Sequence, residues 1–303
     1  MQGRSGGSRI SINQMTTYRG TFAEDVEQYQ AAGVGGIAVW HRKLWEFGEE
    51  RGADLVLDSK LAVTSLWCAG GFTGYDGQSF QESLDEALAA LRLASELRAE
   101  NLIVVTGHRA GHTTNHAQEL VCDALFELGE AANDLDLQVA LHPMTDADSL
   151  LTSLPAALKL LRRCGHRRVG LACDLAEWKR AAPLNCSAAA LAPWVKVALI
   201  TTPVGLAVGD GSVPCSDAAS EAVQEFEAAG YQGWYELQLQ GSVYWSLESN
   251  RLLEDCDRGL RRLCPVPAPA VAPVPVESDS SAASQGSAIS SAARLLSARE
   301  QYP

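Results

Sequence analysis

Three side chains in this sequence could together bind a metal ion or transfer a proton: His142, Asp174 and Glu236. Each belongs to a short run in which large apolar residues alternate with small or polar ones. Because successive side chains of a β-strand point to opposite faces, the three polar groups lie on the face away from the large apolar residues. One imidazole and two carboxylates are ligands that suit a divalent ion such as Mn²⁺, Mg²⁺, Zn²⁺ or Fe²⁺.

The elements that must position these residues alternate regularly along the chain. Short β-branched or apolar runs begin near residues 10, 36, 61, 102, 137, 168, 195 and 233. Helical patterns lie between them, and capping boxes at 21–24 and 79–82 predict the starts of two helices. Strands that alternate with helices pair in parallel, and eight such units predict an α/β fold, a closed (β/α)8 TIM barrel. The alternative is a doubly wound open sheet with a small extra domain, which the count of eight disfavours.

In such a barrel the chemistry lies at the carboxyl ends of the strands. Alternation predicts that four of the strands point these residues into the barrel: Gln138, Ala140 and His142; Gly170, Ala172 and Asp174; Lys196, Ala198 and Ile200; Trp234, Glu236 and Gln238. His142, Asp174 and Glu236 are therefore expected to converge at the barrel mouth. The alternative is that the two carboxylates accept hydrogen bonds from the backbone there or pair with Lys196. Uncompensated burial of charge is costly, which favours a functional centre.

Further residues near the ends of the strands are candidates for contacts with a substrate. They are Trp40, His41, His108, Trp178 and Lys196. Aromatic walls, to which Trp67 would also contribute, suit the apolar face of a sugar. Packing of long loops is the alternative explanation for the aromatic residues.

The charge and the cysteines of the chain exclude several classes of function. There are 37 acidic and 24 basic residues, a net charge of −13, so neither nucleic acid nor an anionic membrane is expected as a partner. No apolar run approaches the roughly 20 residues that span a bilayer. The eight cysteines include no CxxC pair, which indicates free thiols in a reducing compartment. Residues 1–9 lack the apolar segment of a secretory signal, so a cytoplasmic location is expected.

Composition divides the chain into three parts. Residues 1–9 are rich in Gly, Ser and Arg and are expected to be flexible. Residues 10–264 hold the strand and helix units and approach the length of about 250 residues that is typical of a TIM barrel. In residues 265–303 Pro first alternates with Ala and Val, and then Ser and Ala dominate, which predicts an extended linker and a disordered tail. A Pro-rich motif that docks a partner is the alternative for this tail.

Five segments carry a family resemblance: Ser11–Gln14, Gly36–Trp40, Gly71–Gly74, Gly111–Ala117 and Gly233–Glu236. In their order along the chain they resemble the xylose isomerase-like TIM-barrel family, the superfamily of sugar phosphate isomerases and epimerases. The resemblance implies a small-molecule, carbohydrate-like substrate and one divalent ion (Mn, Mg, Co, Zn or Fe). It also implies a homo-oligomer, because members of the superfamily are frequently dimers or tetramers.

The resemblance further implies a set of metal ligands, from which this chain departs. Family members typically hold the ion with a Glu after strand five, an Asp after strand six, a His or Gln in strand seven and a Glu in strand eight. Asp174 and Glu236 match two of these ligands, and His142 stands where the first Glu is expected. Ala198 stands at the strand-seven position, and Glu177 replaces a His that often follows the Asp.

Two functions follow from this resemblance. The first is a metal-dependent isomerase, epimerase or related lyase that acts on a sugar, polyol or small keto-acid through an enediolate. His142, Asp174 and Glu236 would hold the ion, and Glu236 or His142 would be the base. The second is a non-catalytic barrel that has lost the ion and binds a carbohydrate or a protein partner. DNA repair at a trinuclear zinc site, as in the related AP endonuclease, is disfavoured by the acidic charge and by the shortage of ligands.

Overall fold

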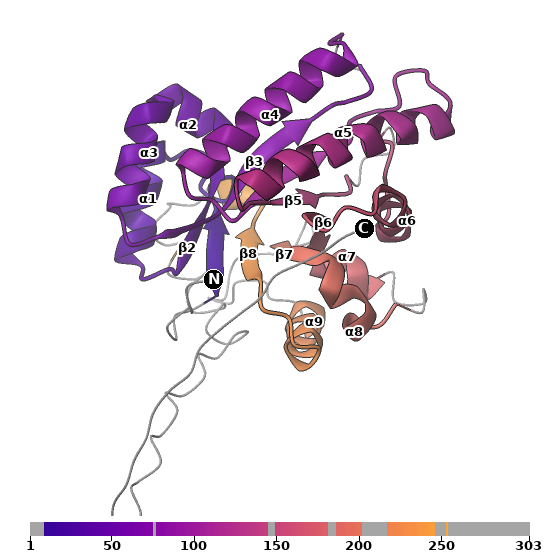
Figure 1. The fold of residues 1–303 in the computed structure, drawn as a ribbon. Coiled ribbons are helices and arrows are strands. Elements are labelled where there is room, and N and C mark those ends of the chain that lie inside the picture. The colour runs from indigo at the N-terminus through magenta and orange to yellow at the C-terminus, as the bar shows by residue number, and fades with distance from the viewer. Residues whose placement is uncertain are drawn as a thin grey trace, which may run out of the picture. The chain divides into compact units, whose positions relative to one another are not determined.

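Eight parallel strands form a closed barrel in the computed structural model, in which each strand pairs with the next and β8 pairs with β1 (Figure 1). The structure describes residues 9–74, 77–144, 149–180, 186–201, 217–245 and 253. The strands are β1 (Ile10–Asn13), β2 (Gly36–Trp40), β3 (Ala62–Gly70), β4 (Asn101–Val105), β5 (Gln138–Leu141), β6 (Val169–Asp174), β7 (Val195–Thr201) and β8 (Trp234–Gln238). The predicted TIM barrel is therefore confirmed.

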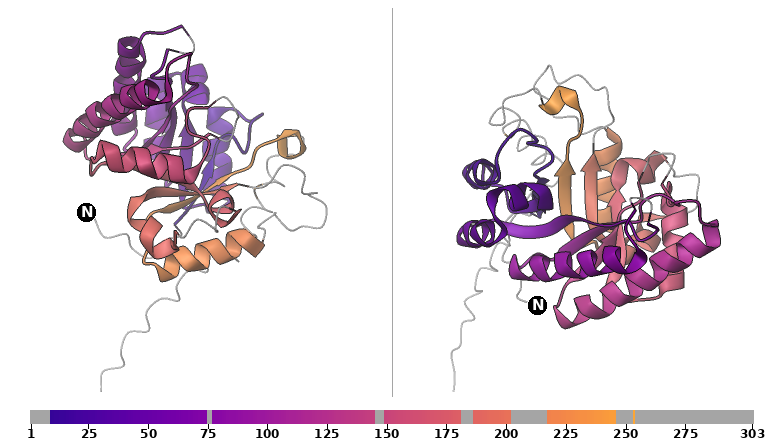
Figure 2. Two further views of the ribbon diagram at one scale, coloured as in Figure 1. Left: turned by 90° about the vertical axis from the view of Figure 1, so that its right-hand side faces the viewer. Right: turned by 90° about the horizontal axis from the view of Figure 1, so that it is seen from above.

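Helices surround the strands (Figure 2). They are α1 (Phe22–Ala31), α2 (His41–Phe47), α3 (Glu49–Asp58), α4 (Phe80–Glu96), α5 (Thr114–Asp134), α6 (Leu154–Cys164), α7 (Leu175–Arg180), α8 (Ala188–Leu191), α9 (Asp217–Ala228) and α10 (Ser242–Trp245), with a 3-10 turn at Ala192–Trp194. Both predicted capping boxes are confirmed, with Thr21 and Glu24 at the start of α1 and Ser79 and Glu82 at the start of α4. None of the described helices is long and apolar enough to cross a membrane.

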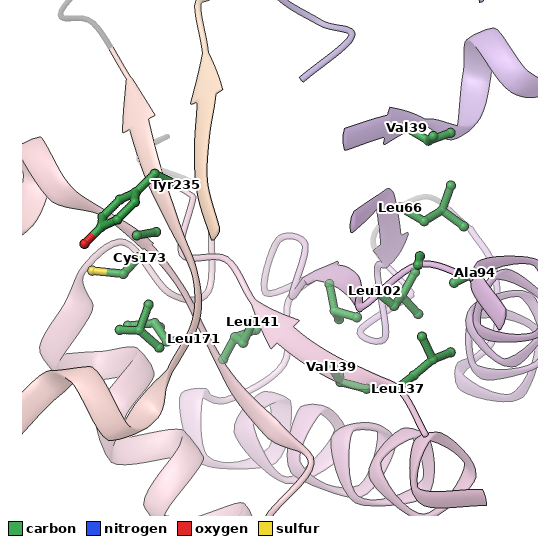
Figure 3. Close-up of a cluster of buried hydrophobic side chains, with 14 of the residues drawn as sticks. Val39, Leu66, Ala94, Leu102, Leu137, Val139, Leu141, Leu171, Cys173 and Tyr235 are labelled. Atoms are coloured by element: carbon green, nitrogen blue, oxygen red, sulfur yellow. The ribbon is translucent and has the colours of Figure 1, made fainter. Parts of the chain in front are cut away.

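Alternation of side chains along the strands produces two apolar layers. The outer layer lies between strands and helices, and Figure 3 shows part of it: Val39, Leu66, Leu102, Val139, Leu141, Leu171, Cys173 and Tyr235. The inner layer fills the barrel: Ala38, Trp67, Ile103, Ala140, Ala172, Val197, Leu199 and Trp234. The large residues of β5, β6 and β8 lie in the outer layer, which confirms the facing predicted for these three strands.

The facing predicted for β7 is wrong. Ala198 and Ile200 belong to the outer layer, whereas Val197 and Leu199 lie inside the barrel. The cause is a register shift between β6 and β7. Leu171 pairs with Val195 and the next residue, Ala172, pairs with Val197, so the pairing skips Lys196 and the facing of later residues is reversed. Lys196 is the one polar residue between positions 195 and 200, so alternation offered no contrast of polarity from which to read the facing.

The barrel closes where the first strand meets the last. The backbone N–H of Tyr235 donates to the carbonyl of Arg9 at 2.9 Å. The Arg9 guanidinium donates to the carbonyls of Tyr231 at 2.8 Å and Gly233 at 3.2 Å. It also forms an ion pair with Glu227, which accepts a second hydrogen bond from the hydroxyl of Tyr235 at 2.7 Å. Side chains as well as backbone therefore join the two strands.

The described residues fall within a compact unit, Met1–Pro267. A second unit, Ala268–Pro303, lies outside the described residues, and so does the whole of the predicted tail at 265–303. Of the predicted flexible N-terminus at 1–9, the described residues include Arg9 alone.

Candidate functional site

Glu236 lies in the middle of β8 and points across the barrel toward β1 and β3. Its side chain has no exposed surface. One carboxylate oxygen, Oε1, accepts hydrogen bonds from Asn13 Nδ2 at 2.8 Å and from Trp67 Nε1 at 2.6 Å. The other oxygen, Oε2, accepts from the hydroxyl of Ser65 at 2.7 Å. Burial raises the pKa of Glu236 to about 6, and the three hydrogen bonds oppose that rise.

Asp174, the last residue of β6, is half-buried and is also hydrogen-bonded through both oxygens. Oδ1 accepts from the backbone N–H of Glu177, in the first turn of α7, at 2.9 Å. Oδ2 accepts from the hydroxyl of Thr201, the last residue of β7, at 2.6 Å. Partial burial, and then the charge of Asp174, raise the pKa of Glu177. Asp174 therefore joins the ends of two neighbouring strands.

His142 directly follows β5. Its ring contacts the edge of the Trp67 ring, with 5.4 Å between the centroids and 66° between the planes. Burial lowers the pKa of His142, which favours the neutral imidazole. Its Nδ1 atom is buried and has no hydrogen-bond partner among the described residues. Trp67 thus contacts both His142 and Glu236, through its ring and its N–H respectively.

Among the described residues, the side chains at the mouth do not form a set of ligands for a divalent ion. In the described ranges no group of three His, Cys, Asp or Glu side chains is arranged so that it could hold a metal. Both oxygens of Glu236 already accept hydrogen bonds, three in all, which leaves about one acceptor position for a cation. On β7, the residue that pairs with both Asp174 and Glu236 is Leu199, which is apolar and lies inside the barrel. The role of His142, Asp174 and Glu236 as metal ligands remains a prediction. The hydrogen bonds to Glu236 and the apolar Leu199 argue against it.

Trp40, at the end of β2, lies beside the mouth and lines a pocket of about 330 Å³. The pocket is formed by the loop after β1, the start of α1, the end of β2 and helix α2. The ring of Trp40 lies 5.7 Å from that of Tyr18, and the guanidinium of Arg42 lies 5.9 Å from its centroid. Trp40 is therefore a predicted substrate-contact residue that lines a pocket.

Two histidines predicted to contact a substrate make other contacts. His41 is the first residue of α2, and its Nε2 lies 3.1 Å from an oxygen of Glu49, with both side chains exposed. His108 forms an isolated β-bridge with Ser149, and its carbonyl accepts a hydrogen bond from Thr73. The substrate contact predicted for each remains a prediction.

Trp178 packs against α9, and Lys196 lies at the end of the barrel opposite the mouth. Trp178, in α7, packs edge-on against Phe226 of α9 at 5.2 Å and belongs to the outer layer. The ammonium of Lys196 donates to the carbonyl of Arg167 at 3.2 Å, just before β6 begins. A Cβ atom on Gly170, near the start of β6, would lie 2.6 Å from the Lys196 side chain. Lys196 therefore lies at the amino ends of the strands, opposite the mouth, and does not pair with Asp174 or Glu236.

No local sequence pattern predicts three of the hydrogen-bond donors around the two carboxylates. Asn13, Ser65 and Thr201 stand on three different strands, and no local motif links them to Glu236 or Asp174. A polar residue at an inward position of a strand was the available signal. Alternation in β1 would have identified Asn13, because Ile10 and Ile12 are the outward apolar residues of that strand. In β3 the pairing with β2 skips Thr64, so Val63 lies in the outer layer and Ser65 faces into the barrel although they are two positions apart. Strict alternation would therefore have assigned Ser65 to the outer face.

Replacing Glu236 with glutamine is expected to change how stability depends on pH. The pKa of Glu236 is about 6 in the folded protein, above the ordinary value of 4.5, so the folded state binds the proton more tightly than the unfolded state. The free energy of unfolding of the wild type should therefore fall, by about 2 kcal/mol, as pH rises through this interval. Glu236→Gln lacks this loss, so its stability relative to the wild type should improve by that amount between about pH 4.5 and pH 7.

Urea unfolding at both pH values measures this difference. Glu127, an exposed carboxylate on α5, supplies the control variant Glu127→Gln, for which no such change is expected. Equal pH dependence in the wild type and Glu236→Gln would contradict the raised pKa.

Comparison with known proteins adds the following findings. The family model described as "Xylose isomerase-like TIM barrel" matches residues 26–254. Comparison with curated protein sequences gives no match. The solved structure of protein SMc04130 from Sinorhizobium meliloti 1021 is similar, with 22% identity and a TM-score of 0.72, over 84% of this chain and 98% of that one.

Two other similar structures have descriptive names. The IolI protein with a bound zinc atom has 15% identity and a TM-score of 0.68, over 84% of this chain and 97% of that one. D-psicose 3-epimerase, solved in the presence of D-fructose, has 12% identity and a TM-score of 0.66, over 84% of this chain and 98% of that one. At these identities the similarity shows a shared fold.

Proposed function

Because the chain belongs to the xylose isomerase-like TIM barrel family, we propose that it binds a small carbohydrate and needs no divalent ion to do so. The observation that carries this proposal is the enclosure of Glu236, whose two oxygens accept hydrogen bonds from three side chains. A carbohydrate is supported as the ligand class by the similarity to D-psicose 3-epimerase, which was solved with D-fructose.

The enclosure of Glu236 also argues against proton transfer by this residue. A general base must come within hydrogen-bond reach of the substrate atom from which it takes the proton. Glu236 has no exposed surface, and three of its roughly four acceptor positions are used. Trp67, itself buried, contacts both Glu236 and His142. The non-catalytic barrel that binds a carbohydrate is therefore the function that this geometry supports best.

A metal-dependent isomerase or epimerase is the second candidate, and one observation favours it. The Nδ1 atom of His142 is buried without a hydrogen-bond partner in the described part of the chain, which leaves its lone pair or its proton unsatisfied. A bound ligand or ion could satisfy it. The similar structure of IolI contains a zinc atom.

The two candidates differ in what should stabilise the purified protein. After dialysis against EDTA, millimolar Mn²⁺, Mg²⁺, Co²⁺ or Zn²⁺ should leave the midpoint of thermal unfolding unchanged. Saturation-transfer NMR on the same metal-free sample should detect binding of D-fructose or D-psicose. The two sugars should not interconvert. Elemental analysis of the protein before dialysis should find far less than one metal ion per chain.

Each result has a counterpart that would overturn part of the proposal. A metal-dependent rise in the unfolding midpoint that disappears in Asp174→Ala would establish the second candidate. Interconversion of the sugars by the EDTA-treated protein would keep the metal-free site but make the protein an enzyme. Absence of binding to both sugars would remove the ligand class.

A further inference from the structure

The pocket of about 330 Å³ beside the barrel mouth is separate from the residues that enclose Glu236. We propose that this pocket, with the rings of Tyr18 and Trp40 as its platform, is where the protein binds a monosaccharide or a polyol. This inference rests on the proposed function for the class of ligand and adds the place of the site. Binding pockets for small molecules range from about 300 to 1,000 Å³, so the volume suits a single sugar better than a longer chain.

Aromatic side chains form a continuous strip along this side of the mouth. The ring of Tyr18 stacks on that of Trp245, in α10, with 4.6 Å between centroids and 26° between planes. The centroid of the Tyr18 ring also lies 5.7 Å from that of Trp40, and the two ring planes make an angle of 34°. Tyr18 keeps 42% of its surface exposed even so. Exposed aromatic surface of this kind can pack against the C–H face of a sugar while the hydroxyl groups remain hydrogen-bonded at its edge.

Hydrogen-bond donors and acceptors that could bind the hydroxyl groups of a sugar lie beside this strip. The Nε atom of Arg42 donates to Glu46 Oε1 at 3.0 Å, and both residues line the pocket. The guanidinium of Arg42 also lies over the ring of Trp40. The pair offers N–H donors and carboxylate acceptors side by side. Hydroxyl groups can donate and accept at once, so they match this pair better than an anion or a cation does.

A buried network holds the pocket in shape before any ligand binds. The ammonium of Lys43 donates to Asp25 Oδ2 at 2.6 Å and to the carbonyl of Thr17 at 2.7 Å. The side chain of Gln14 donates to the same oxygen of Asp25 at 3.0 Å and accepts from the backbone N–H of Trp40 at 3.0 Å. These bonds tie the loop after β1 to the end of β2 and to α2. A site fixed in this way loses little conformational freedom on binding.

Sugar binding by substituted proteins tests the location. D-fructose, D-glucose and D-glucitol are titrated into metal-free full-length protein and followed by saturation-transfer NMR. Tyr18→Ala should weaken binding by about tenfold because it removes the stacking surface, whereas Tyr18→Phe, which keeps the ring, should bind about as well as the wild type. Trp45→Ala is the matched control, since Trp45 lies on α2 with 69% of its surface exposed and is not among the lining residues.

Each outcome identifies which claim fails. If the wild type binds none of the three compounds, the proposed function fails. If the wild type binds but Tyr18→Ala behaves like Trp45→Ala, the proposed function stands and the location is wrong. Loss of binding in His142→Ala together with full binding in Tyr18→Ala would place the ligand in the barrel mouth instead. Thermal unfolding of Tyr18→Ala near the wild-type midpoint confirms that weaker binding does not reflect a failure to fold.

Discussion

Lys43→Met is expected to lower the free energy of unfolding by about 3–5 kcal/mol. Lys43 and Asp25 are both buried, with exposed fractions of 5% and 0%, and their charged atoms lie 2.6 Å apart. Removing the ammonium leaves the Asp25 carboxylate buried without a cation beside it. Its Oδ1 atom already lacks a hydrogen-bond partner among the described residues. Urea unfolding at pH 7 measures the loss.

The pH dependence of this loss gives a second test of its origin. Burial raises the pKa of Asp25 to about 6 although Lys43 opposes the rise. Without Lys43 the carboxylate should take up a proton still more readily, and a neutral Asp25 needs no cation. The stability difference between Lys43→Met and the wild type should therefore shrink as pH falls toward 6, over the interval between the pKa of Asp25 in the variant and its value of about 6 in the wild type, and should stay constant at lower pH.

Two further variants separate the buried charge from other effects of the substitution. Arg42→Met removes a neighbouring cation whose ion pair with Glu46 is exposed, so a change within about 0.5 kcal/mol is expected. The double variant Lys43→Met with Asp25→Asn removes both charges and keeps an acceptor for Gln14, so it should recover at least half of the loss. Equal instability of the single and double variants would contradict the role of the unpaired carboxylate.

Glu236→Ala is expected to destabilise the protein by about 4 kcal/mol or more. The substitution leaves three buried donors without an acceptor, namely the side chains of Asn13, Ser65 and Trp67. Each unsatisfied buried group costs about 1–3 kcal/mol, and the empty volume adds to the cost. These donors come from β1 and β3, so the substitution also removes side-chain hydrogen bonds that link β8 to two other strands.

Glu236→Gln is the matched control for this prediction. Its carbonyl oxygen can accept from Asn13 and Trp67, and its amide can donate to the hydroxyl of Ser65, which can also accept. A change within about 1 kcal/mol is therefore expected near pH 6. If alanine at this position were tolerated as well as glutamine, the network around Glu236 would not be a main support of the barrel.

The fold could be predicted from the sequence because each unit leaves a local signal. The runs at β5, β6 and β8 alternate large apolar residues with small or polar ones, and their facing was correctly predicted. In β7 Lys196 is flanked by apolar residues on both sides, and the register shift that passes over it depends on how β6 lies beside it. Such a shift depends on both strands and cannot be predicted from the sequence of either strand alone.

The candidate site was predictable only in part for a related reason. His142, Asp174 and Glu236 were identified because a polar group at the end of an apolar run is conspicuous. Their hydrogen-bond partners depend on the stagger of the strands in the closed barrel, which brings Ser65 and Trp67 of β3 to Glu236 of β8. The pairing of Asp25 with Lys43 likewise joins a helix after β1 to a helix after β2 and follows no sequence spacing.

The closing of the barrel by Arg9 has a consequence for synthesis of the protein. Arg9 and Tyr231 are hydrogen-bonded although 222 positions separate them along the chain. On the ribosome, the outer edge of β1 therefore has no partner until nearly the whole barrel has been translated. An uncovered strand edge is a template for pairing with another chain. The nascent protein is exposed to misassembly for most of its elongation, and that exposure ends when β8 leaves the exit tunnel.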